Sequence, residues 1–506
     1  MTQSEPLVLL GTGTSPLDPA RLDTGALSFR EDVPATETGF ALIDTIDGRI
    51  AASGRLLIST PAEMSLIGER LRCEQPQAAP DFLDRMPEGA VTGALSGTVP
   101  QLRALMTVAR GTALRQRLAL VDDEGKTVLR CDLWDLRPEA GQAVSVAVLV
   151  PLRGYDKALR RIARQVGAQG TAADPARAAA LLRGEDPAAT GKAAPAIRED
   201  QPAFEAAAAI IREQIAVARS REAGTIADID TEFLHDYRVA LRRVRSVVSL
   251  FKGVFSEAET ARLKTRFGAI MARTGRLRDL DVYLLERAEY IALVPESRRA
   301  GLSRLFDRFA EERADEQAKL AAWLGSKGYL QEIGRLERLF AKASRLEQGP
   351  LADRLAPDYA RALIWKRYRK VCKLAAHIQD APDEQVHELR IHCKKLRYLM
   401  EFFAPLFGAS EVKSLIKSLK RLQDNLGLFN DYSVQQVSLE EAQAGIAADP
   451  DAQTAEIAAG IGALVAVLAA RQAEERARVA ASFARFDSDE TRAAFRKLFK
   501  PGEDAR

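Results

Sequence analysis

Two stretches of this chain are near copies of each other: residues 235–251 read HDYRVALRRVRSVVSLF, and residues 387–403 read HELRIHCKKLRYLMEFF. An offset of 152 residues aligns them without a gap, and matches continue beyond them. The later matched pairs are Phe251 with Phe403, Phe255 with Phe407, Gly275 with Gly427, Asp279 with Asp431, and Val282 with Val434. A spacing kept across both segments indicates a duplicated unit that carries a histidine and several cations in each copy.

The repeated segment predicts a helix with a cationic stripe beside an apolar one. Residues spaced by 3, 7 and 10 positions lie within about 80° of arc on a helix. In the first copy these are His235, Arg238, Arg242 and Arg245, and in the second His387, Arg390, Lys394 and Arg397. Arg243 and Lys395 flank the stripes. The adjoining arc, which we expect to face the core, carries Tyr237, Leu241, Val244 and Val248.

The charge of the stripes predicts an anionic partner. The whole chain has a net charge of +3, yet residues 235–252 hold five cations and one acid, and residues 387–400 hold four and one. Phosphate suits such a face because charged hydrogen bonds contribute about 1.5–3 kcal/mol each. Two stripes in related positions would hold a long polyanion better than separate ions. The alternatives are a solvated face and histidines with a structural role.

Two further basic stretches either widen this surface or are solvated faces. The first consists of Lys413, Lys417, Lys420 and Arg421, and the second of Arg361, Lys366, Arg369, Lys370 and Lys373. We include the first set, together with Arg369 and Lys373, in the predicted binding site. No cofactor or metal is expected: Cys372 and His377, for example, are five residues apart, which on a helix is a poor chelating geometry.

Composition divides the chain into a β-rich part and a helical part, an α+β protein. Residues 1–183 contain short, partly alternating segments separated by turns, which predict an antiparallel sheet or barrel. Residues 184–202 are rich in proline, alanine and charge without periodicity and are predicted to be a linker. Residues 203–498 have helical periodicity, with repeats at about 204–350 and 351–498, each predicted to form about four helices.

The location predicted from the sequence is the cytoplasm. The four cysteines are scattered outside any CxxC pair, which is typical of a reducing compartment. The first residues, MTQSEPLVLLGTG, lack the basic start of a signal peptide, and no segment reaches the roughly 20 apolar residues that span a membrane. The alanine-rich residues 457–470 are therefore interpreted as a buried helix, and no membrane partner is expected.

The two basic segments, with LKRLQDNLGLFNDYSV at residues 419–434, resemble the CHAD domain (conserved histidine α-helical domain). The resemblance extends from about residue 204 to 499. It implies two pseudo-symmetric four-helix bundles whose basic cleft or pore binds inorganic polyphosphate without catalysis. It also implies a location on polyphosphate granules, where some similar proteins collect. By position, the family's basic motifs fall on His235, Arg238, Arg242, Arg243, Arg245, His387, Arg390, Lys394, Lys395 and Arg397.

Residues 42–60 and 144–166 resemble parts of a CYTH domain, the triphosphate tunnel fold, in a degenerate form. The opening ExExK signature is missing, and Ser145, Ala147 and Leu149 stand where acidic residues are expected to alternate. A triphosphatase of this class needs carboxylates for Mg²⁺ and cations for phosphate, and only Arg115 and Arg117 remain as candidates. We therefore expect a non-catalytic domain.

Two other functions stay open at this stage. The first is a triphosphatase or polyphosphate hydrolase that uses the N-terminal barrel. The second is a nucleic-acid-binding protein, although the basic helices lack the interleaved aromatic residues that stack on bases.

Overall fold

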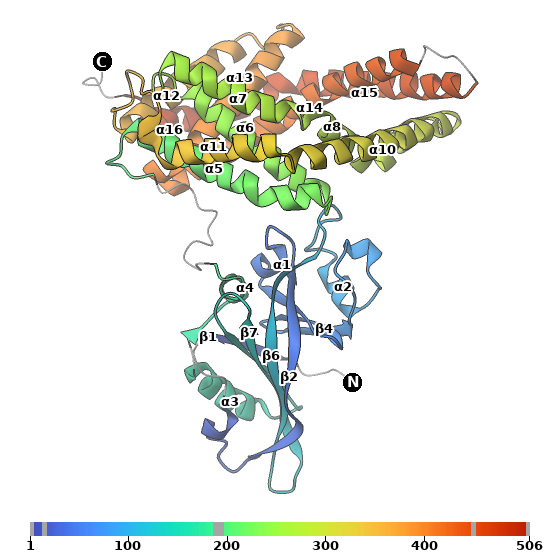
Figure 1. The fold of residues 1–506 in the computed structure, drawn as a ribbon, viewed down its shortest axis with the longest axis vertical. Coiled ribbons are helices and arrows are strands. Elements are labelled where there is room, and N and C mark those ends of the chain that lie inside the picture. Colours follow the sequence, from blue (N-terminus) through green and yellow to red (C-terminus); the bar gives the residue numbers. More distant parts are fainter. Residues whose placement is uncertain (1–4, 13–17, 170, 186–196, 447–451, 502–506) are drawn as a thin grey trace. The chain divides into compact units, whose positions relative to one another are not determined.

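The chain divides into two compact units, Met1–Ala193 and Ala194–Arg506, in a computed structural model that describes residues 5–12, 18–169, 171–185, 197–446 and 452–501 (Figure 1). The first unit is a sheet with short helices and the second is helical, so the α+β prediction is confirmed. Most of the predicted linker, residues 186–196, lies outside the described ranges.

The described part of the first unit forms one antiparallel sheet in the order β5-β4-β3-β2-β6-β7-β8-β1-β9. The strands are β1 Leu7–Thr12, β2 Ser28–Asp44, β3 Arg55–Ser59, β4 Glu63–Gly68, β5 Leu71–Pro76, β6 Met106–Val121, β7 Thr127–Pro138, β8 Val144–Pro151 and β9 Thr171–Ala172. The backbone N–H of Val8 donates to the carbonyl oxygen of Glu69 at 2.9 Å, which joins β1 to the β4–β5 turn. The sheet therefore curls towards a barrel.

Helices cover this sheet at several places. They are α1 Arg49–Ala52, α2 Ala90–Leu95, α3 Asp156–Ala168 and α4 Pro175–Leu182, with 3-10 turns at Pro19–Arg21 and Leu83–Arg85. The concave face packs Val144, Val146 and Val148 against Trp134 and α4, whereas Leu149 packs outward against α3. The alternation of β8 thus turns Ser145, Ala147 and Leu149 away from the interior, where valines stand instead.

The second unit consists of helices joined by short connections. They are α5 Ala203–Ile226, α6 Thr231–Leu250, α7 Glu257–Ala272, α8 Gly275–Leu285, α9 Arg287–Leu293, α10 Glu296–Leu324, α11 Lys327–Ala341, α12 Ala356–Ala375, α13 Asp383–Phe403, α14 Ala409–Ile446, α15 Ala452–Phe486 and α16 Asp489–Phe499. Turns of 3-10 helix lie at Ala343–Arg345 and Ala404–Leu406.

The helices keep the 152-residue offset that the sequence shows. Helix α5 corresponds to α12, α6 to α13, α7 with α8 to the single α14, and α10 to α15. Residues related by the offset also meet: the Phe251 and Phe403 rings stack with centroids 4.9 Å apart, and Arg304 pairs with Glu456. A residue contacts its own equivalent only near a two-fold axis, so these pairs lie close to an approximate two-fold axis between the repeats.

Helix α15 is the only described helix that is long and apolar enough, by length and composition, to cross a membrane. Its side chains Ile457, Ile461, Leu464 and Leu468 are fully buried with residues of α10 and α14. Figure 1 shows α10 and α15 side by side along much of their length. One face of α15 is therefore packed in the helical unit, whereas only 33% of its apolar window is buried, so the predicted buried helix is buried on one face.

Candidate functional site

The helical unit contains a cavity of about 1020 Å³ that both repeats line. Five of its lining residues were predicted from the duplication: His235, Arg238 and Arg242 of α6, and Arg390 and Lys394 of α13. The other cations of its wall are Arg276 and Arg278 of α8 and Arg471 of α15. The structure therefore gathers cations of both repeats around one space.

Helix α6 is oriented by its cap and its apolar stripe. The Asp230 carboxylate accepts hydrogen bonds from the backbone N–H groups of Glu232 (2.9 Å) and Phe233 (3.2 Å), which begins the helix. The helix ends just before Gly253, whose φ of 76° suits glycine. The predicted apolar stripe is buried: Tyr237, Leu241, Val244 and Val248. With that stripe in the core, helical spacing brings the cationic stripe to the cavity.

The matched arginines Arg238 and Arg390 are partly buried donors. Arg238 Nη1 donates to Thr274 Oγ1 at 2.6 Å, and Arg390 Nη2 donates to Asp431 Oδ1 at 3.2 Å. In the described part of the chain, the buried Nε atom of each has no hydrogen-bond partner. Burial lowers the pKa of both guanidinium groups. A buried donor without an acceptor costs about 1–3 kcal/mol, so both arginines would gain from an anion.

The matched cations Arg242 and Lys394 bring charge to the cavity that no ion pair neutralises. Neither side chain makes an ion pair with a carboxylate of the described residues. Burial, and next the charge of Arg390, lowers the pKa of the Lys394 amine to about 8. Asp431 opposes this shift and the charge of Arg242 contributes to it, so the two equivalent side chains, which line the same cavity, repel each other. An anion between them would relieve this repulsion.

The two matched histidines have different surroundings. His235 lines the cavity, whereas His387 is exposed and lies outside its lining. The Nδ1 atom of His387 lies 2.6 Å from Asn430 Oδ1. Because an amide oxygen only accepts, Nδ1 carries the proton and the Nε2 atom faces away from this bond.

Several predicted cations lie elsewhere on the same helices. Arg243 and Arg397 share the carboxylate of Glu401, at 3.5 and 3.6 Å. Lys395 lies beside cations of α12, on another face of α13. Arg245 is exposed and does not line the cavity. The last residue of each stripe, Arg245 and Arg397, therefore lies outside the cavity lining, as do the flanking Arg243 and Lys395.

The remaining predicted residues are exposed and outside the cavity lining. On the first half of α14 these are Lys413, Lys417, Lys420 and Arg421, and on α12 they are Arg369 and Lys373. The sequence interpretation missed Arg276, Arg278 and Arg471. The equivalents of Arg276 and Arg278 are Leu428 and Asn430, so a search for repeated cations passes over them. Two signals were available: Arg276 and Arg278 follow the matched Gly275, and Arg471 matches Lys319 at the 152-residue offset.

The cavity is not uniformly basic. Its carboxylates are Asp279, Glu286, Glu289, Asp431 and Glu441. Three exposed apolar side chains of α14 also line it, namely Leu428, Val434 and Val437. The cations of α6 and α13 therefore share the cavity with carboxylates and apolar side chains.

The interior of the N-terminal sheet holds a compact network of ion pairs. Arg115 donates to Asp132 (2.6 Å) and Glu63 (2.5 Å), and its guanidinium lies 4.0 Å from the centroid of Trp134. Arg72 pairs with Asp132 at 2.7 Å and Glu74 at 2.6 Å. The sequence interpretation had looked for acids on β8 and missed these three carboxylates, which come from β4, β5 and β7.

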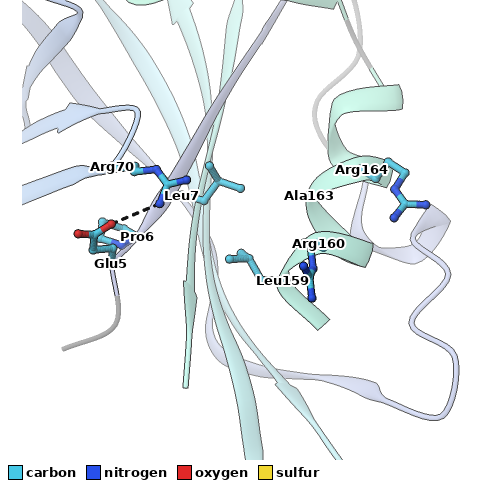
Figure 2. Close-up of a pocket in the computed structure, with 8 residues that line it drawn as sticks. All are labelled: Glu5, Pro6, Leu7, Arg70, Leu159, Arg160, Ala163 and Arg164. Carbon is cyan, nitrogen blue, oxygen red and sulfur yellow. Dashed lines mark hydrogen bonds and ion pairs between the residues drawn. The ribbon is translucent and has the colours of Figure 1, made fainter. Parts of the chain in front are cut away.

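Cations satisfy those carboxylates in the described structure. Arg117 also reaches Glu63 and Asp132, at 3.4 and 3.5 Å, so three arginines face three acids. Among the described residues, no group of three or more acidic, histidine or cysteine side chains is arranged to hold a metal ion. A smaller pocket between β1 and α3 has exposed arginines, of which Arg70 pairs with Glu5 at 3.3 Å (Figure 2).

Comparison with known proteins finds a family match for the helical unit. The family model of the CHAD domain matches residues 209–440. One similar solved structure is the CHAD domain from the plant Ricinus communis, with 25% identity, a TM-score of 0.47, and coverage of 61% of this chain and 96% of that chain. Another is PptA from Streptomyces chartreusis, with 14% identity, a TM-score of 0.40, and coverage of 59% and 100%. No curated protein matches the chain.

The matched range contains both basic helices, α6 and α13, and most of α14. It also contains the five predicted residues that line the cavity. Residues 209–440 of this chain therefore form a CHAD domain.

Proposed function

We propose that the helical unit binds inorganic polyphosphate, without catalysis, in the cavity that the two repeats share. The observation that carries the proposal is the pair Arg242 and Lys394, which are equivalent cations, line one cavity and make no ion pair with a described carboxylate. The CHAD match supports it, because these domains are generally non-catalytic.

A chain of phosphates fits the distribution of charge better than a single ion. The donors come from α6, α8, α13 and α15, so a linear ligand can satisfy several of them at once. Arginine offers planar paired donors to phosphate oxygens, and lysine offers a compact charge. The buried Nε–H donors of Arg238 and Arg390 lack acceptors, and the phosphate oxygens of such a chain would accept from them.

The test replaces Arg242 and Lys394 with glutamate in the full chain and measures polyphosphate affinity by calorimetry. Loss of a charged hydrogen bond costs about 1.5–3 kcal/mol, so the double variant should bind at least tenfold more weakly. Helicity should not change, because Arg242 is exposed and Lys394 is outside the core. Lys413→Glu with Lys417→Glu, on exposed positions of α14, is the matched control.

If the double variant binds polyphosphate with the affinity of the parent, the cationic stripe is only a solvated face. Competition adds a second arm: duplex and single-stranded nucleic acid are titrated against bound polyphosphate at equal phosphate concentration and constant salt. We expect that neither nucleic acid displaces the bound polyphosphate. Displacement by nucleic acid would favour the nucleic-acid alternative.

The N-terminal unit supports one alternative, a triphosphatase. The interior carboxylates Glu63, Glu74 and Asp132 could in principle serve Mg²⁺, but arginines engage each of them. We therefore propose that this unit is not catalytic. A cytoplasmic location, with recruitment to polyphosphate granules, completes the proposal.

A further inference from the structure

A second group of cations surrounds His392, where α12, α13 and the end of α6 come together. Arg367 Nη1 lies 2.8 Å from His392 Nδ1, and Lys370 Nζ lies 3.1 Å from Glu388 Oε1. Lys395 lies three residues after His392 on the same face of α13, and burial, followed by the charges of Arg367 and Lys252, lowers the pKa of its amine, so Lys252 is counted with the group. Among the described residues, Lys370 alone of these four cations makes an ion pair, and its partner Glu388 also lies 3.6 Å from His392 Nε2.

The bonding within this group is unusual for a solvated basic face. Arg367 directs its donor at a neutral imidazole nitrogen, since only an unprotonated Nδ1 can accept. No carboxylate of the described residues lies within ion-pair distance of Arg367 or Lys395. Burial lowers the pKa of His392 to about 4, with the charges of Arg367 and Lys395 acting in the same direction. His392 is only 13% exposed, so the imidazole is held within the group.

This group is separate from the cavity. At about 100° per residue, His392 lies about 160° around α13 from Arg390, which lines the cavity. Glu388, His392 and Lys395 follow one another at spacings of four and three, so they form their own stripe. None of the residues around His392 is part of the cavity lining.

The first repeat lacks this arrangement. The equivalents of Arg367 and Lys370 are Ile215 and Ala218, and both are buried. The equivalent of His392 is Ala240, and that of Lys395 is Arg243, which Glu401 already neutralises at 3.5 Å. The cluster is therefore specific to the second repeat and cannot be explained as a remnant of the duplicated stripe.

We propose that Arg367, Lys370, His392, Lys395 and Lys252 form a second oxyanion site, which binds the phosphate groups of a condensed phosphate independently of the cavity. The oxygens of the ligand accept from Arg367 and Lys395. The imidazole, released from Arg367, takes up a proton and becomes a further donor to the bound anion. Glu388 stays with Lys370 and limits the site to strongly charged ligands.

The charged groups facing His392 determine the sign of its titration. Arg367 and Lys370 of α12 and Lys395 of α13 disfavour its protonation, and Glu388 favours it. A bound polyanion outweighs the three cations, so the pKa of His392 rises on binding. Binding at this site is thus coupled to partial proton uptake by His392, which is greatest near pH 5.

The test follows the imidazole Cε1–H signal of His392 by NMR in the histidine-labelled full chain. The chain has four histidines, so His392→Gln assigns the signal by its disappearance. Without ligand the signal should stay flat from pH 5 to 8. Saturating sodium tripolyphosphate should bring a titration into that window, which is a rise of at least one pH unit. An unchanged curve with tripolyphosphate present would overturn the proposal.

Two variants separate this site from the cavity. In Arg242→Glu with Lys394→Glu, the His392 response should persist, and its loss would show that both belong to one site. In Arg367→Gln with Lys395→Gln, the response to tripolyphosphate should disappear while cavity affinity remains. Orthophosphate in place of tripolyphosphate shows whether a single phosphate suffices: a response at least tenfold weaker is expected, and an equal one would assign the site to phosphate rather than to condensed phosphate.

Discussion

The protonation of Lys394 should make polyphosphate binding in the cavity depend on pH. Its amine has a pKa of about 8, lowered by burial and by Arg390, against an ordinary value near 10.5. In the free protein the amine is charged below pH 8 and loses its proton as the pH rises through 8. A bound polyanion favours the charged form and holds the proton to higher pH. Polyphosphate affinity should therefore be steady near pH 7 and fall between pH 8 and 10.

Calorimetric titrations at pH 7.0, 8.0, 9.0 and 9.5, at constant ionic strength, measure this fall. We expect about a tenfold loss, the value of one charged hydrogen bond. Lys394→Arg is the control, because an arginine keeps its charge throughout this range and should remove most of the dependence. Equal slopes for the parent and for Lys394→Arg would assign the effect to another group.

At this scale the sequence identified the right cations only where the duplication repeated them. Arg242 and Lys394 were predicted because both copies keep a cation at one helical phase. Arg276 and Arg278 were missed because their equivalents are not cations, and the role of Lys395 depends on Arg367, which belongs to another helix. Contacts between helices are set by tertiary packing, which helical spacing alone does not contain.

Among the elements, the duplicated helices were the most predictable part of the fold. Helices α6 and α13 contain the repeated segments but begin four residues before them, at Thr231 and Asp383, and the predicted apolar stripe of α6 is buried. The subdivision of the other helices was not predictable in the same way. Helix α14 is continuous, whereas the corresponding segment of the first repeat breaks into α7 and α8 at Thr274, a buried residue that bonds Arg238.

The crossing of α10 and α15 depends on glycine. A Cβ atom on Gly301 would lie 2.1 Å from the backbone carbonyl oxygen of Glu456, far inside van der Waals contact. Gly301→Ala should therefore force the helices apart and destabilise the helical unit by about 1–3 kcal/mol. For a unit of this size the thermal midpoint should fall by about 2–4 °C per kcal/mol. Differential scanning calorimetry measures the change.

Gly462 on α15 provides a matched control. A Cβ atom there would meet nothing within 4 Å. Gly462→Ala should raise stability by about 0.5–1 kcal/mol, because alanine is the better helix former. A stabilising Gly301→Ala would mean that α10 and α15 can separate without cost.

On the scale of the whole chain, the sequence correctly predicted a sheet unit followed by a helical unit and the CHAD domain. It was less informative about the interior of the sheet. The direction of β8 side chains depends on register, and a one-residue error moves Ser145, Ala147 and Leu149 from one face to the other. The carboxylates that do face the interior come from three strands, and periodicity within one strand could not bring them together.

The two units should differ in function, because their cations differ in whether carboxylates pair with them. Arg242 and Lys394 lack carboxylate partners, whereas the interior of the sheet matches Arg72, Arg115 and Arg117 with three acids. A triphosphatase needs carboxylates free for Mg²⁺ and cations free for phosphate. Full-length protein incubated with tripolyphosphate and Mg²⁺ should therefore release no phosphate above the protein-free rate, in a colorimetric assay.

Variants of each unit show which unit is responsible for any turnover that the assay detects. Any turnover from the sheet should survive Arg242→Glu with Lys394→Glu, because those residues belong to the helical unit. It should disappear in Arg115→Ala, which removes the central arginine of the network and leaves Asp132 with Arg72 and Arg117. Turnover with that pattern would make the N-terminal unit an enzyme. Its absence, with polyphosphate still bound by the parent, would leave the helical unit as a receptor.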